Sequence, residues 1–340
     1  MIMKNNFSHF LITGANGFIG RRLSEHLKSL GVTITAVLRK QNNALDKLWD
    51  QVIIHDFNND NNFSKHLTNL PNKKIEAIVH LANIAHNDGD INFENYWNTN
   101  VTSTLDLLDF AVSSKAKSFL YVSSVKAVKT PKDNICVDES YNMWPSNQDF
   151  YGTSKRIAEE LVQRFINYNN HNLHTTILRP SLVYGEDVKG HLRLLINAAK
   201  KQLLPNLPNI NNKRSMVHID DLVNAILIAI NHPNANKKIF IVSDNIHYST
   251  KEICNHIKNQ ITPKKPLCWL SSIKVPYLLL KIIAKLSDLL QLIFKKYLSD
   301  RFCFNSNALD KMFGSSCFSS KKIQTAIDWH PKHTFFDQKI

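Results

Sequence analysis

The chain has 340 residues, which suits a large α/β domain with a smaller partner rather than one minimal domain. Its formal net charge of +14, from 42 Lys and Arg against 28 Asp and Glu, favours anionic ligands such as nucleotides or sugar diphosphates. The basic residues are scattered and no nucleic-acid-binding module is recognisable, so a nucleic-acid partner is not expected.

The cysteines and the first residues of the chain indicate the cellular compartment in which the protein is expected. Five cysteines without a CxxC pair predict a reduced protein with neither a disulfide framework nor a metal site. They are Cys136, Cys254, Cys268, Cys303 and Cys317. The first residues lead directly into a strand and lack the long apolar core of a signal peptide. We therefore expect a cytoplasmic protein.

Short apolar segments alternate with helical patterns through the first half of the chain. The expected strands are His9–Thr13, 32–38, 52–55, 77–81, 119–123 and 175–178. Helical patterns lie between most of them, including 101–114 and 154–167. Nearly continuous apolar strands between helices are typical of a parallel sheet that is covered on both faces. The sequence predicts an α/β fold, with a doubly wound parallel sheet of the Rossmann type over residues 1–180.

The pattern changes after Pro180. Helices are expected at 190–201 and 220–231 and a late strand at 239–242, among proline-punctuated loops. Residues 181–340 are predicted to form mainly a smaller α+β substrate domain, with some segments returning to the first domain.

Residues 275–296 are densely apolar, but Lys281, Lys285, Asp288 and Lys295 interrupt them at helical spacing. Each such charge near the centre of a bilayer costs about 2.5–3.5 kcal/mol, so no membrane span is expected. The favoured interpretation is one or two amphipathic helices packed on the smaller domain. Peripheral membrane contact and a homodimer surface remain as alternatives.

A glycine-rich turn, TGANGFIG, joins the first strand to the first helical pattern. Its glycines allow a tight turn, close approach of backbone to a pyrophosphate and close packing of helix on strand. The following helix presents free N–H groups and the positive end of its dipole to phosphate. The residues expected to bind a dinucleotide here are Gly14, Asn16, Gly17, Phe18, Ile19 and Gly20. A glycine-rich turn without a ligand is the alternative.

The residues after the second and third strands bear on the coenzyme. A fold selective for NAD usually has Asp or Glu after the second strand, to bind the ribose 2′-hydroxyl. Arg39 stands there instead and can bind a 2′-phosphate, which favours NADP(H), with NAD as the other possibility. Arg39 stacking on adenine or pointing to solvent is the alternative. Asp56 and Phe57 are expected to flank the adenine, with an ordinary turn at the strand end as the alternative.

Tyr151 and Lys155 form the second strong motif, YGTSK. Residues four apart share one face of a helix, so an ammonium group can lie beside a phenol. The ordinary pKa of tyrosine, about 10, is too high for a base near neutrality, and a neighbouring cation lowers it. The motif therefore predicts a proton-transferring tyrosine, close to a strand that ends in Ser123 and Ser124.

The motifs and their order resemble the extended short-chain dehydrogenases/reductases, the nucleotide-sugar epimerases, dehydratases and reductases. The resemblance covers essentially the whole chain. It rests on TGANGFIG, HLA at 80–82, Asn100, Ser123-Ser124, YGTSK, RPSLVYG at 179–185 and RSMVHIDDL at 214–222.

The resemblance implies a role for each group of residues. Ser124 would hydrogen-bond the reacting oxygen, Tyr151 would transfer its proton and Lys155 would also hold the nicotinamide ribose. The other residues expected at the coenzyme are Leu81, Ala82 and Asn100. The UDP-sugar substrate is expected to contact Ser124, Val125, Lys126, Tyr151, Lys189, Arg193 and Arg214, with Arg214 on the diphosphate. A surface arginine before a helix capped by Asp220 is the alternative for Arg214.

Three positions depart from the family pattern. Ser103 replaces the usual Gly after the Asn100 motif, Phe150 replaces a Pro that often precedes the tyrosine, and Asn83 follows HLA in place of Ala or Gly. None of these changes removes a catalytic group. For Asn100, a structural or proton-relay role and a plain helix-start cap remain open.

Val125 and Lys126 limit which reactions of this family are expected. Sugar-nucleotide 4,6-dehydratases carry an Asp-Glu pair there, and valine cannot move a proton, so a dehydratase is disfavoured. SSVK, the segment 311–322 and DWHP at 328–331 resemble the UDP-N-acetylquinovosamine-forming 4-ketoreductases of bacterial surface polysaccharide synthesis. In that reaction NAD(P)H delivers hydride to C4 of a 4-keto sugar while Tyr151 protonates O4. A UDP-hexose 4-epimerase with tightly bound NAD is the rival, and a non-catalytic binding module a remote one.

Overall fold

The computed structural model describes residues 7–41, 47–58, 63, 74–84, 92–131, 134–168, 172–188, 190–261, 275–293 and 306–339. A parallel seven-stranded sheet, in the order β3-β2-β1-β4-β5-β6-β9, forms its larger part. The strands are β1 (His9–Thr13), β2 (Thr33–Leu38), β3 (Gln51–Ile54), β4 (Ala77–His80), β5 (Ser118–Val122), β6 (His174–Pro180) and β9 (Lys238–Val242). The strand order reverses between β1 and β4, which is where such sheets bind ligands.

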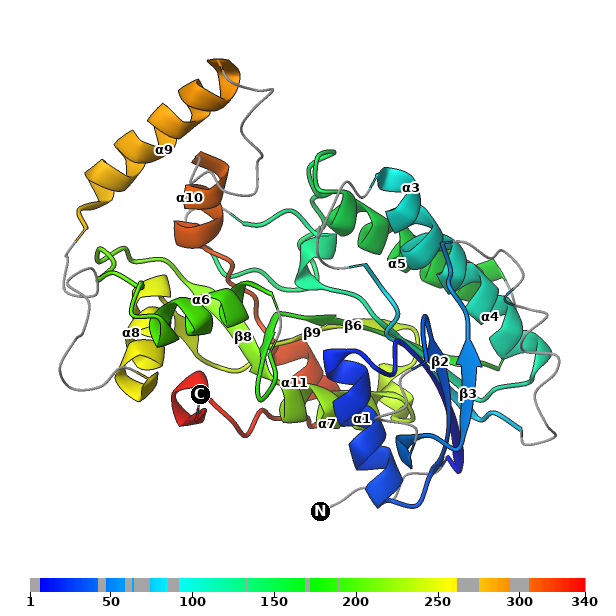
Figure 1. Ribbon diagram of the computed structural model, residues 1–340. Helices are drawn as coiled ribbons and strands as arrows, with labels where there is room; N and C mark the ends of the chain where they lie inside the picture. The colour runs from blue at the N-terminus through cyan, green and yellow to red at the C-terminus, as the bar shows by residue number, and fades with distance from the viewer. Residues whose placement is uncertain are drawn as a thin grey trace.

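Helices cover both faces of this sheet (Figure 1). One face packs on α1 (Phe18–Ser29), α7 (Ile219–Ala229) and α11 (Lys321–Ile327). The other packs on α4 (Ser103–Ser113) and α5 (Phe150–Tyr168). Each of these helices turns an apolar stripe towards strands that are buried on both sides. The prediction of a doubly wound Rossmann fold is confirmed.

A smaller part is built on a three-stranded sheet. Its strands are β7 (Leu182–Tyr184), β8 (Arg214–His218) and β10 (His247–Tyr248), in the order β10-β8-β7. Around it lie α6 (His191–Lys200), α8 (Thr250–Ile261), α9 (Tyr277–Ile293) and α10 (Ser306–Phe313), which share one apolar cluster. Figure 1 shows these helices at the end of the molecule away from β2 and β3.

The second half of the chain does not stay in the smaller part. Strand β9 pairs with β6, and α7 and α11 pack on the large sheet, although all three follow residue 180. A boundary at that residue therefore separates the two halves only in part. The sequence did not indicate β7, β8 or β10, because three short strands carry too little alternation to stand out.

The prediction of a chain without disulfides is wrong. Cys136 and Cys317, 181 residues apart, are joined by a disulfide with their Cα atoms 4.5 Å apart. A β-bridge between Val137 and Phe318 brings the two segments together. Sequence spacing reveals local pairs such as CxxC, but this pairing depends on the tertiary fold.

Candidate active site

The glycine turn after β1 is packed so tightly that side chains would not fit. Gly14 has a φ of +66°, and a Cβ there would lie 2.9 Å from the amide nitrogen of Ala82. A Cβ on Gly20 would lie 2.7 Å from the Cα of Ala15. Gly17 caps α1 with extended backbone and no side-chain hydrogen bond, and the first turn of α1 carries no acidic residue. The N–H groups of that turn therefore suit a pyrophosphate, which is the group a dinucleotide presents.

A buried hydrogen-bond network fixes the end of β4 against this turn. The Thr13 hydroxyl oxygen accepts from the amides of Leu81 and Ala82, at 3.1 and 3.0 Å, and lies 2.7 Å from His80 Nδ1. His80 Nε2 lies 3.0 Å from the Thr104 hydroxyl. Burial holds the pKa of His80 well below its usual range, so the ring is neutral in this network. His80 thus positions the two residues expected at the coenzyme.

The residues expected at the adenosine end lie on the same edge of the sheet. The Gly14 amide donates to Val37 O at 3.1 Å, which places the end of β2 beside the turn. Arg39 follows that strand and is exposed. Asp56 and Phe57 follow β3, where the Phe57 ring packs 5.0 Å from the Phe63 ring. Their contacts with a coenzyme stay predictions.

Ser124 and Tyr151 meet because α5 begins very close to the turn after β5. Asp149 Oδ1 accepts from the Gly152 amide at 3.0 Å and so caps the helix. A Cβ on Gly152 would collide with the backbone carbonyl of Lys126, so only glycine allows this approach. The Ser124 hydroxyl hydrogen-bonds the Tyr151 phenol, which lowers the pKa of Tyr151. Burial outweighs that effect and raises the pKa to about 12.

Lys155 lies one turn further along α5 and is fully buried. Its Nζ donates to the Val122 carbonyl at 2.9 Å and lies 4.7 Å from the Tyr121 ring centroid. Burial lowers the pKa of Lys155 to about 7, so the amine is only partly charged near neutrality. Lys155 is not among the groups that shift the pKa of Tyr151 in this geometry, so a lowering of that pKa by Lys155 stays a prediction. Instead, Lys126 Nζ lies 5.5 Å from the Tyr151 ring.

A buried ion pair holds α5 against the sheet. Glu159 accepts two hydrogen bonds from Arg179 on β6, at 2.9 and 2.6 Å, and both side chains are buried. Removing one partner of such a pair leaves an uncompensated charge and is strongly destabilising. Arg179, the first residue of the RPSLVYG motif, thus has a structural role. No motif in the sequence indicated Glu159 as its partner.

Asn100 also has a structural role here. It lies inside a π-helical segment, Trp97–Thr102, so the alternative of a helix-start cap is wrong. Its Nδ2 donates to the Ser154 hydroxyl at 2.9 Å, and its Oδ1 accepts from the Ile84 amide at 3.0 Å. These two bonds join the segment after β4 to the helix that carries Tyr151.

The residues expected at the substrate are spread over both parts. Val125 is buried and Lys126 exposed directly after Ser124, while Arg193 is exposed on α6. Arg214 begins β8, and its guanidinium donates to Thr250 Oγ1 at 3.1 Å and to Met312 O at 2.9 Å. Lys189 lies outside the described residues.

The alternative interpretation of Arg214 is wrong about the helix cap. Arg214 is half-buried, and this burial lowers its pKa. The helix that follows, α7, is capped by His218, whose side chain accepts from the Asp220 amide. The alternative required a surface arginine and a cap made by Asp220.

A parallel sheet with a glycine turn at its switch point, beside a Ser–Tyr–Lys group, defines a dinucleotide-dependent enzyme. The chain belongs to the NAD dependent epimerase/dehydratase family, whose profile matches residues 10–243. The turn fits the coenzyme of that family, because its glycines allow the tight backbone packing at the start of α1 and leave the N–H groups of the first turn of that helix for phosphate.

Two curated relatives align over most of the chain. One is a UDP-glucose 4-epimerase from Vibrio cholerae, 29% identical over 95% of this chain and 91% of that protein. The other is an N-acetyl-alpha-D-glucosaminyl-diphospho-ditrans,octacis-undecaprenol 4-epimerase from Escherichia coli O157:H7. It is 23% identical over 93% of this chain and 88% of that protein.

Solved structures share the fold. A UDP-glucose 4-epimerase from Thermotoga maritima, with UDP-glucose, superposes with a TM-score of 0.72 at 17% identity, over 97% of this chain and 95% of that one. MoeE5, in complex with UDP-glucose and NAD, gives a TM-score of 0.70 at 19% identity over the same shares.

Proposed function

We propose that the protein reduces the 4-keto group of a UDP-linked 2-acetamido-2,6-dideoxy-hexos-4-ulose. The product is UDP-N-acetylquinovosamine or its 4-epimer, made in the cytoplasm for O-antigen or another surface polysaccharide. The observation that carries the choice of a reductase is Arg39, which is exposed at the end of β2 and suits the 2′-phosphate of NADPH, the reducing coenzyme. Burial raises the pKa of the Tyr151 phenol to about 12, so the phenol is protonated near neutrality and can donate a proton.

The proposed chemistry divides between coenzyme and protein. The reduced nicotinamide supplies the hydride for C4 when it is bound. Tyr151 donates its proton to O4 as negative charge develops there, and Ser124, hydrogen-bonded to the phenol, steadies the same oxygen. Lys155, four residues along α5, is proposed to hold the nicotinamide ribose. Buried Val125 leaves no acid or base at the position where dehydratases carry one.

We further propose NADPH as the preferred coenzyme. Support comes from Arg39, which is exposed at the end of β2 and makes no ion pair within the residues described. A 2′-phosphate would provide the charged partner that its guanidinium fork fits. The proposed contact for the diphosphate of UDP is Arg214, helped by Lys189 and Arg193.

A 4-epimerase that retains NAD is the second candidate. The similarity to the Vibrio cholerae UDP-glucose 4-epimerase, which extends over 95% of this chain, favours it. The two reactions use nearly the same residues, so the catalytic group alone does not separate them. They differ in whether coenzyme is consumed.

The test is to follow NADPH absorbance with the UDP-linked 6-deoxy-4-keto sugar, and separately to assay UDP-glucose and UDP-N-acetylglucosamine for their 4-epimers. A reductase uses coenzyme as a substrate, so we expect one NADPH oxidised per keto sugar reduced and no epimer formed. Rapid epimerisation without added coenzyme, together with no NADPH oxidation on the keto sugar, would overturn the proposal in favour of the epimerase.

A further inference from the structure

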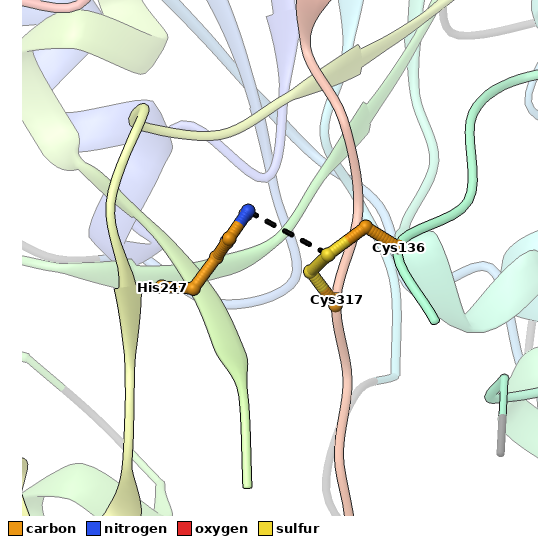
Figure 2. Close-up of side chains that lie close together, drawn as sticks. All are labelled: Cys136, His247 and Cys317. Atoms are coloured by element: carbon orange, nitrogen blue, oxygen red, sulfur yellow. Dashed lines mark hydrogen bonds between the residues drawn. A yellow bond between two sulfur atoms is a disulfide. The ribbon is translucent and has the colours of Figure 1, made fainter. Parts of the chain in front are cut away.

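Two cysteines and a histidine meet where the loop before α5 crosses the C-terminal segment. Figure 2 shows the disulfide between Cys136 and Cys317 with the imidazole of His247 directed at it. His247 Nε2 lies 3.6 Å from Cys136 Sγ. Cys317 is fully buried, whereas Cys136 and His247 are exposed. None of the three belongs to the catalytic group.

Backbone pairing keeps the two sulfur atoms close together. The Val137 amide donates to Cys317 O at 3.1 Å, and the Ser319 amide donates to Val137 O at 2.9 Å. These bonds do not depend on the sulfur–sulfur bond. The Cα–Cα distance of 4.5 Å lies within the range that disulfides require. The cysteines are therefore placed to reform the bond after it is broken.

The hydrogen bonds of Ser215 indicate which nitrogen of His247 is protonated. The Ser215 hydroxyl donates to Phe318 O at 3.1 Å, so its oxygen is an acceptor for His247 Nδ1–H, 3.4 Å away. This assignment leaves Nε2 without a proton and facing Cys136. Burial and Lys213 lower the pKa of His247, which favours the same neutral ring. A neutral Nε2 can accept the proton of a thiol.

The site is open to small molecules. Cys136 and His247 line a cleft of about 970 Å³, together with Asp138, Tyr141 and Asn245. A tripeptide-sized thiol can therefore reach Cys136, while Cys317 stays covered.

We propose that Cys136 and Cys317 form a reversible thiol–disulfide site that exchanges with a low-molecular-weight thiol such as glutathione. In the oxidising direction His247 takes the proton of Cys136, whose thiolate attacks the external disulfide and releases one external thiol. Cys317 then attacks Cys136 Sγ, which forms the internal bond and releases the second external thiol. The internal pair loses two electrons and two protons, and the external disulfide gains them.

The exchange would change how firmly the strand that carries Arg214 is attached to the loop before α5. Ser316, next to Cys317, pairs with Arg214, and the Ser215 amide donates to Ser316 O at 2.9 Å. The disulfide therefore ties the loop between Ser124 and Tyr151 to the strand that carries Arg214. We expect UDP to bind more weakly to the reduced protein, a readout that rests on the proposed function. The linkage itself does not.

Peptide mapping under non-reducing conditions tests the linkage. Protein equilibrated with glutathione disulfide should yield a Cys136–Cys317 peptide that dithiothreitol removes. Because the bond closes a long loop, its reduction should lower Tm by roughly 5 °C, and Cys136→Ser should abolish that redox dependence. Cys254→Ser changes a buried free thiol and is the matched control. His247→Gln should slow formation of the bond and leave its equilibrium nearly unchanged.

Three outcomes would overturn the proposal. In the first, both cysteines are alkylated after treatment with glutathione disulfide and no linked peptide forms. In the second, the reduced protein holds one zinc ion that Cys136→Ser loses and that prevents oxidation. The same three side chains are close enough to bind such an ion. In the third, His247→Gln forms the bond at the wild-type rate.

A separate observation concerns α9, which lies at the outer edge of the molecule (Figure 1). Six large apolar side chains on one stripe of this helix are exposed, up to 70% for Leu278. They are Leu278, Leu279, Ile282, Ile283, Leu286 and Leu289. The opposite side packs on the protein through Ala284, which is fully buried. None of the helices described is long and apolar enough to cross a membrane.

We infer that this stripe lies on an anionic lipid surface. Lys281 and Lys285 are exposed on the same helix, and the flanking sequence contributes basic pairs at 264–265 and 295–296 with few acids. An exposed apolar stripe with cations beside it is typical of helices that lie in the interface of a membrane. Attraction to anionic headgroups would add to burial of the leucines and isoleucines.

Vesicle sedimentation tests this second inference. The protein should pellet with phosphatidylcholine vesicles that contain phosphatidylglycerol, less with pure phosphatidylcholine, and less at high salt. The double variant Ile282→Ser/Leu286→Ser should stay in solution, whereas Leu194→Ser, at an exposed leucine of α6, should not change binding. A wild-type protein that ignores both vesicles would overturn the inference. So would a lipid-free dimer that the double variant dissociates, because the stripe would then be a dimer surface.

Discussion

At the scale of a single residue, two opposing effects set the pKa of Tyr151. The Ser124 hydroxyl stabilises the phenolate, while burial favours the neutral phenol, and the balance raises the pKa to about 12. Neither effect could be judged from YGTSK alone, because both depend on what surrounds the ring.

Removing the phenolic oxygen tests the proton donor. Tyr151→Phe should keep the fold and coenzyme affinity but lower turnover at least ~100-fold, the lower end of the effect of general acid catalysis. Steady-state kinetics and coenzyme titration on the same preparation measure both. Near-normal turnover in a homogeneous variant would show that another group donates the proton.

Charge reversal tests the coenzyme contact. Arg39→Asp should weaken NADPH binding much more than NADH binding, because it replaces attraction to the 2′-phosphate with repulsion. Fluorescence titration of both coenzymes against both proteins gives the four constants. Lys40→Asp, at the exposed neighbour, controls for a general change in surface charge. Equal wild-type affinity for the two coenzymes would contradict the assignment.

The first turns of α5 show how one element places several groups. Asp149 caps the helix, Gly152 allows it to approach the Ser124 turn, and Lys155 is carried into the protein interior. The Glu159–Arg179 pair joins the same helix to β6. Burial of Lys155 lowers the free energy of unfolding by an amount that depends on pH.

Replacing Lys155 with an apolar side chain should remove this loss of stability. Between about pH 7, the pKa of folded Lys155, and its ordinary value of 10.5, the unfolded chain holds a proton that the folded chain lacks. The free energy of unfolding of the wild type therefore rises with pH across this window. Lys155→Met should be more stable by on the order of a few kcal/mol at pH 7, and this advantage should shrink towards pH 10. Urea unfolding at several pH values measures it, and a pH-independent difference would contradict it.

At the scale of the whole molecule, the C-terminal segment packs against α7. Trp329 is fully buried and its Nε1 donates to Asp221 O at 3.1 Å. The Asp221 carboxylate accepts from the amides of Lys332 and His333, at 3.0 and 2.9 Å. These contacts thus brace α7, which packs beside α1.

Truncating this tryptophan should destabilise the whole chain. Trp329→Ala leaves a cavity at the junction and should cost about 3–5 kcal/mol of the free energy of unfolding. Phe336→Ala, at a half-exposed ring nearby in sequence, should cost far less. Chemical denaturation of the three proteins compares them. Equal midpoints would show that the C-terminal segment does not brace α7.

The sequence by itself determined the features that short segments encode. The glycine turn, the seven strands of the large sheet and the placing of Tyr151 and Lys155 on one helix follow from local periodicity and glycine geometry. Only the tertiary structure decided which distant residues meet. The Cys136–Cys317 bond, the Arg179–Glu159 pair and the bond from Lys155 to Val122 join separate elements. Burial, which sets the pKa values of Tyr151 and Lys155, is a property of the packed molecule, so residue spacing could not reveal it.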